Sequence, residues 1–196
     1  GDGAGAPTTN VALDVTTTGA DPDGYLTLTG DISTAGDSSD EAGAIDLSGV
    51  SESIILADTD GTVTISTDAA TTDRDITLGT INDDGNLRNL TLNADEGDVT
   101  LQGSVGQTDR IGQLTITDVN DVSIQQAVDS GAITIYTQET SAPEADSITI
   151  AGVTVDSNGG DIELRSDDID LSAGPSLIST GGATQAVFAG ETGAST

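Results

Sequence analysis

A repeat of short apolar triplets constrains the fold of this chain more than any other feature of its sequence. Rows of the repeat begin at Ile76, Val99, Val122 and Ile148, and they open with ITLGTI, VTLQGSV, VSIQQAV and ITIAGV. A second apolar triplet follows in each row, at residues 90–92, 114–116, 133–135 and 162–164. A row of about 23 residues is too short to bury its own apolar face, so successive rows must stack to make a core. The sequence therefore predicts a solenoid.

The triplets alternate apolar and polar residues, which is the pattern of a strand with one buried face. Thr, Val and Ile fill most of these positions and favour strands. Residues at equal offsets in successive rows should lie above one another, roughly 4.8 Å apart. The expected inward ladders are Ile76, Val99, Val122 and Ile148; Leu78, Leu101, Ile124 and Ile150; Ile81, Val105, Val128 and Val153; and Leu90, Leu114, Ile133 and Ile162. Thr77, Thr100, Ser123 and Thr149 should line the outside.

The predicted fold is all-β, a parallel β-helix with coils of about 23 residues over residues 26–178. Residues 1–25 are expected to form a flexible lead-in with a first strand, and residues 179–196 a tail or cap. A longer row starts at Ile45, and a degenerate last row is expected from Leu171. The alternative is an antiparallel β-sandwich, because Asp-Gly pairs typical of hairpin turns lie between predicted strands. They occur at residues 23–24, 60–61 and 84–85.

The charge of the chain restricts the partners it can bind. It carries 34 acidic residues against four basic ones, a formal net charge of −30. Such a surface repels nucleic acid and anionic membranes, and it attracts cations. No apolar run is long enough to cross a bilayer, and without cysteine there is no disulfide framework. We therefore expect neither nucleic-acid binding nor membrane insertion.

Two Asp-x-Asp-Gly segments are the candidate metal sites. The first contains Asp21 and Asp23, and the second contains Asp58 and Asp60. Two carboxylates in this spacing before a glycine can present oxygens to Ca²⁺, but turns select Asp and Gly for backbone reasons as well. Neither a complete EF-hand loop nor a Gly-Gly-x-Gly-x-Asp signature occurs. Calcium therefore stays open as a ligand, and we expect no required cofactor.

Catalysis is not expected from this composition. Asp167, Asp168 and Asp170 could form a carboxylate cluster, but with 34 acidic residues some adjoin by chance. The chain has no Lys, His or Cys for basic or nucleophilic roles. No catalytic residue is assigned.

Three segments resemble the repeats of a known class of bacterial surface proteins. They are DITLGTI (75–81), NLTLNADEGDVTLQGSVG (89–106) and QLTITDVNDVSI (113–124). They resemble the filamentous-haemagglutinin-like adhesins and autotransporter passengers, over roughly residues 45–178. The resemblance implies a right-handed parallel β-helix that serves as a stalk, an adhesin or an exported filament. The secretion domain and translocator of that class have no counterpart in this sequence. The chain is therefore expected to be a mature or excised piece of a longer protein.

The expected function is that of a structural extracellular segment of a prokaryotic, most simply bacterial, cell-surface adhesin, stalk or self-assembling filament. Its expected partners are further copies of itself, stacked end to end, or a host cell, a neighbouring cell or a glycan. The alternative is a calcium-dependent carbohydrate-binding module that uses the Asp-x-Asp-Gly turns. These hypotheses differ in whether the chemistry is repetitive along the chain or focused at one site.

Overall fold

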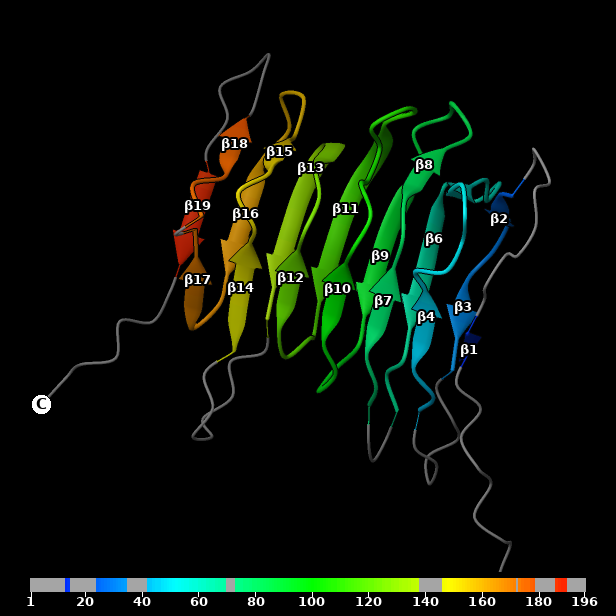
Figure 1. Cartoon of the computed structure of the whole chain (residues 1–196), viewed down its shortest axis with the longest axis horizontal. Coiled ribbons are helices and arrows are strands. Elements are labelled where there is room, and N and C mark those ends of the chain that lie inside the picture. The colour runs from blue at the N-terminus through cyan, green and yellow to red at the C-terminus, as the bar shows by residue number, and fades with distance from the viewer. Residues whose placement is uncertain are drawn as a thin grey trace, which may run out of the picture.

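The computed structural model of the chain describes residues 13–14, 24–34, 42–69, 73–137, 146–171, 173–178 and 186–189. Within these ranges the regular structure consists of strands and contains no helix. Every strand pair that they form is parallel. Figure 1 shows the coils side by side along the longest axis of the molecule. The β-helix prediction is confirmed, and the antiparallel sandwich is excluded.

The coils build three walls. The first wall contains, in spatial order, β1 (Leu13–Asp14), β4 (Ile45–Leu47), β7 (Ile76–Leu78), β10 (Val99–Leu101), β12 (Val122–Ile124), β14 (Ser147–Ile150) and β17 (Asp168–Asp170). The second contains β2 (Leu26–Leu28), β5 (Ile54–Leu56), β8 (Ile81–Asp83), the start of β13 (Val128–Tyr136), β15 (Thr154–Asp156) and β18 (Ser176–Ile178). Val105 bridges β8 to β13.

The third wall completes each coil. It contains β3 (Ile32–Ser33), β6 (Thr62–Ser66), β9 (Asn89–Asn93), β11 (Ile111–Thr117), the second half of β13, β16 (Ile162–Arg165) and β19 (Ala186–Ala189). Strand β13 spans two walls, because its start pairs with β15 and its end with β16. Since β1 pairs with β4 and β19 with β16, the ladders extend on both sides of residues 26–178.

The register follows the repeat in the sequence. Val99 pairs with Ile76 on one side and with Val122 on the other, and Val122 pairs with Ile148. These partners are 23, 23 and 26 residues apart along the chain. Three predicted inward ladders are confirmed: the two on the first wall and the one that contains Leu90, Leu114, Ile133 and Ile162. The predicted outward ladder through Thr77, Thr100, Ser123 and Thr149 also has this register.

Two predicted positions are wrong by two residues. Val128 pairs with Val155 and not with Val153, which is half-buried beside the core. Ile148 pairs with Ile169, so the last row begins before Leu171. Residues two apart point to the same face of a strand, and the alternating pattern cannot choose between them.

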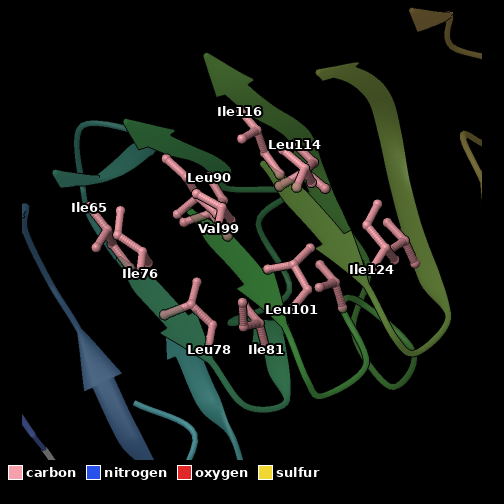
Figure 2. Packing of buried hydrophobic residues seen from close by; sticks show 14 of the residues in the cluster. Ile65, Ile76, Leu78, Ile81, Leu90, Val99, Leu101, Leu114, Ile116 and Ile124 are labelled. Carbon is pink, nitrogen blue, oxygen red and sulfur yellow. The ribbon is translucent and has the colours of Figure 1, made fainter. Parts of the chain in front are cut away.

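The core is a narrow stack of aliphatic layers. Its buried members among the described residues are Leu, Ile, Val and Ala. Figure 2 shows Ile76 and Leu78 of one coil near Val99 and Leu101 of the next, and all four are fully buried. Burying such a side chain contributes about 1.5–3 kcal/mol, so each coil depends on the layers above and below it. No helix within the described ranges could cross a membrane.

Candidate functional site

Three carboxylates from neighbouring turns converge at one edge of the solenoid. Asp68 follows β6, Asp73 precedes β7, and Asp95 follows β9. Each offers one oxygen, and the three oxygens lie within 4.8 Å of one another. Asp68 is exposed, Asp95 is half-buried, and Asp73 keeps 9% of its surface exposed. We call this group the three-carboxylate cluster.

Local hydrogen bonds and one close approach position the cluster. Asp73 Oδ1 accepts the N–H of Ala69, and the N–H of Asp95 donates to Asn93 Oδ1 at 3.2 Å. The turn that carries Asp95 ends at Gly97, where a Cβ would lie 2.5 Å from the carbonyl oxygen of Arg74. This glycine lets the turn lie against the backbone next to Asp73.

The chemistry of the cluster suits a hard cation. Oxygens that share one Ca²⁺, at 2.3–2.6 Å each, lie at most about 5 Å apart, and the cluster meets this limit. Three carboxylates would supply part of the six to eight oxygens that Ca²⁺ takes. Exposed acidic groups also gather without any ion in a chain this acidic. The cluster is therefore a candidate cation site.

Sequence reasoning missed this cluster, although a signal for it exists. Ser66 pairs with Asn93, so Asp68 and Asp95 hold equal offsets two residues later in neighbouring coils. Asp73 lies in the same connection between β6 and β7 as Asp68, at a position that the row pattern does not place. The alignment of rows could have found two of the three members.

The predicted pair Asp58 and Asp60 forms a capped turn after β5. Asp58 Oδ1 accepts the N–H of Asp60 at 3.0 Å, and Asp58 O accepts the N–H of Gly61 at 3.2 Å. Asp58 is 8% exposed, and Asp60 is exposed. Asp21 and Asp23 lie outside the described residues. The assignment of calcium to these four aspartates stays a prediction.

A second group of carboxylates forms a column along the first wall. Asp75, Asp98 and Asp121 precede the paired residues of β7, β10 and β12. The N–H of Asp98 donates to Asp75 Oδ1 at 3.1 Å, and the N–H of Asp121 donates to Asp98 Oδ1 at 3.2 Å. Ser147 continues the pattern with its N–H, which donates to Asp121 Oδ1 at 2.8 Å. This acidic column therefore ties each coil to the next.

The carboxylates of the acidic column repel one another, although hydrogen bonds link them from coil to coil. Burial raises the pKa of the Asp98 carboxyl, and the charges of Asp75 and Asp121 raise it further. The hydrogen bond from Asn120 acts in the opposite direction and lowers that pKa. Asp98 also lines a surface groove of about 250 Å³. The column thus fixes register while it holds like charges close together.

The predicted carboxylate run near the end of the chain lies on the surface. Asp168 and Asp170 are the exposed ends of β17, and Ile169 between them is half-buried. The N–H of Asp168 donates to the carbonyl of Asp146 at 3.0 Å. These contacts place Asp168 in the wall of the solenoid, and the absence of catalysis stays a prediction.

Comparison with known proteins adds no relative to this description. No family model matches the chain. No curated protein matches it, and no solved structure matches it. The resemblance to bacterial surface β-helices therefore stays a prediction from the repeat pattern, and a function has to be argued from the solenoid itself.

Proposed function

We propose that this solenoid is a stiff structural segment of an extracellular, prokaryotic cell-surface protein, used as a stalk, adhesin shaft or filament subunit. The observation that carries the proposal is the uninterrupted first wall, in which β1, β4, β7, β10, β12, β14 and β17 pair in sequence. Its chemistry repeats from coil to coil, as a load-bearing element requires.

Two sets of contacts support stiffness along the axis. Aliphatic side chains stack through the interior, and bending the shaft would separate them from their neighbours. The acidic column links Asp75, Asp98 and Asp121 through backbone N–H groups on the outside. Bending therefore disturbs packing and hydrogen bonds together.

The surface charge affects how copies of the shaft associate. A net charge of −30 keeps such a shaft soluble and prevents sideways association through self-repulsion. Salt of the ionic strength found outside cells screens that repulsion over about 8–10 Å. Solenoid ends must be capped or paired with another chain, so end-to-end stacking of copies is part of the proposal.

Force spectroscopy tests the structural role. A chain held by handles at both ends and pulled should lose its coils in steps, each releasing the 21 to 32 residues that separate paired positions on the first wall. At about 3.6 Å per residue one step adds roughly 80–120 Å of contour length. Extension without steps at low force would contradict a load-bearing role. The seven strands of the first wall, spaced roughly 4.8 Å apart, make a single copy only about 30 Å long, so electron micrographs of the same sample test the end-to-end stacking. Fibres would support the stacking, and separate particles alone would contradict that part of the proposal.

The second candidate is a calcium-dependent carbohydrate-binding module. The observation that favours it is the three-carboxylate cluster, whose oxygens lie within 4.8 Å of one another. Calorimetry with Ca²⁺, followed by glycans in the presence of Ca²⁺, tests this candidate. No heat and no shift in melting temperature at millimolar Ca²⁺ would remove it.

A further inference from the structure

A surface hollow on the second wall has a chemistry different from the rest of the shaft. It has a volume of about 350 Å³ and lies over the outward face of β5 and β8. Its lining includes Tyr25, Glu52, Ile55, Asn82 and Asp109. Small-molecule sites typically begin at about 300 Å³ and combine apolar surface with a few polar groups. The hollow meets both conditions on a small scale.

Tyr25 is an unusual residue to find there. The chain has three aromatic residues in 196, and Tyr25 leaves 51% of its surface exposed. Tyr25 comes directly before Leu26, the first residue of β2, and Leu26 pairs with Ile54 of β5. An exposed ring adds nothing to a core made of aliphatic layers. Its open surface is available to a ligand.

The walls of the hollow are held in place by the fold. Asn82 is 6% exposed, and its Oδ1 accepts the N–H of Thr108 at 3.0 Å and that of Asp109 at 3.3 Å. The N–H of Asp83 donates to Asp109 O at 3.0 Å, which fixes the same loop to β8. The Asp109 wall therefore needs little ordering when a ligand binds.

The opposite wall is held as well. The N–H of Glu52 donates to Gly24 O at 3.4 Å. A Cβ on Gly24 would lie 2.4 Å from Ser51 Oγ, so the chain before Tyr25 lies directly against the segment that carries Glu52. The ring and the carboxylate are neighbours for this reason.

The charges of the lining select the ligand. Glu52 and Asp109 bring two carboxylates, and no arginine is among the described residues that line the hollow. A ring face attracts a cation, a carboxylate strengthens a hydrogen bond from a charged donor, and the field of the whole chain concentrates cations at its surface. We infer that the hollow binds an organic cation, an ammonium or guanidinium group on an apolar body that contacts Tyr25 and Ile55. The group can belong to a free amine or to a Lys or Arg side chain of a partner protein.

The inference can be tested by NMR titration of the ¹⁵N-labelled chain at 0.15 M salt, which screens general attraction to the surface. The probes are butylammonium, methylguanidinium, a capped tripeptide with one lysine, and galactose. Binding of the cationic probes should shift the amide signals of residues 52, 82, 108 and 109. Tyr25→Leu and Glu52→Gln should each raise the dissociation constant about threefold, whereas Tyr25→Phe should retain binding. Glu96→Gln is the matched control, because Glu96 is exposed in the turn after β9 and its substitution removes one negative charge, as Glu52→Gln does.

Each outcome decides the inference. Peptide binding at least about tenfold tighter than butylammonium identifies a partner side chain as the source, and comparable binding identifies a free amine. Binding of galactose without the cations would overturn the inference. It would also be overturned by an absence of any shift, or by equal weakening in Glu52→Gln and Glu96→Gln, which indicates general charge attraction. Spectra of the variants away from the hollow should stay unchanged, which confirms that they fold.

Discussion

Removing one coil in register provides the sharpest test of the solenoid. Deletion of residues 101–123 joins Thr100 to Ile124, and Ile124 then takes the place of Leu101, with which it pairs. The rest of the coil also closes in register, because Val128 can replace Val105 opposite β8. Deletion of residues 101–122 keeps one residue more, Ser123, and reverses the alternation between Thr100 and Ile124. The two variants differ by a single residue.

The structure gives the expected magnitudes. A coil of 23 residues contributes roughly 1–3 kcal/mol of net stability at about 0.05–0.15 kcal/mol per residue, and this is the expected cost of the in-register deletion. The out-of-register deletion must also expel Val99 or Ile124 from the core or force a bulge. Val99 and Ile124 are both fully buried, and loss of such a side chain costs about 2–5 kcal/mol. The longer variant should therefore be the less stable one by at least about 2 kcal/mol.

Urea unfolding followed by circular dichroism measures the stability difference, and small-angle X-ray scattering measures the length. The in-register variant should remain folded and become shorter by roughly 4.8 Å, one strand spacing. Equal stability of the two deletions would refute the reasoning, because it would mean that stacking of matched rungs does not hold the coils. Unfolding of the in-register variant alone would refute it as well.

Three further predictions concern single residues. Asp98→Asn keeps a hydrogen-bond acceptor and removes a stacked charge, so it should stabilise the chain at pH 7 by less than about 1 kcal/mol after solvent screening. Because burial raises the pKa of Asp98 in the folded chain, the stability of the parent chain should fall as the pH rises above 3.8. A series of melting temperatures from pH 4 to 7 should show a smaller fall in Asp98→Asn than in the parent chain. Gly103→Ala should destabilise the chain by about 1–3 kcal/mol, because the added Cβ would lie 2.2 Å from Thr80 N, and an unchanged urea midpoint would contradict this close approach. On the second candidate function, calcium at millimolar concentration should raise the melting temperature of the parent chain and of Asp60→Asn but not of Asp73→Asn, and equal shifts in both variants would place the ion away from the three-carboxylate cluster.

Much of the fold could be predicted from particular residues. The ladders through Val99, Leu101 and Leu114 follow from equal offsets in the rows, because strand alternation and row length together fix which side chains face inward. Val155 and Ile169 were missed in favour of Val153 and Leu171 since residues two apart are equivalent in that pattern. In the row that contains Val155, a turn at Gly152 lies between the first and the second wall, with φ of +69° and an N–H that donates to Ile150 O at 2.9 Å. This turn accommodates the extra residues before Val155.

The candidate sites were far less predictable than the walls. Asp58 and Asp60 were found because they are close in sequence, and the structure shows them in a capped turn. Asp68, Asp73 and Asp95 converge through corners whose lengths differ from coil to coil. The repeat pattern gives Asp68 and Asp95 equal offsets, two residues after the paired Ser66 and Asn93, but it does not place Asp73, which lies outside the periodic strands.

The sequence by itself determined the stack of parallel coils and the aliphatic composition of its interior. Side-chain direction alternates along a strand, and a row too short to hold a core must be completed by its neighbours. Only the tertiary structure decided that Asp73 joins Asp68 and Asp95, and that a hollow forms beside Tyr25. Those meetings depend on distances between turns in different coils, and local residue preferences carry no information about such distances.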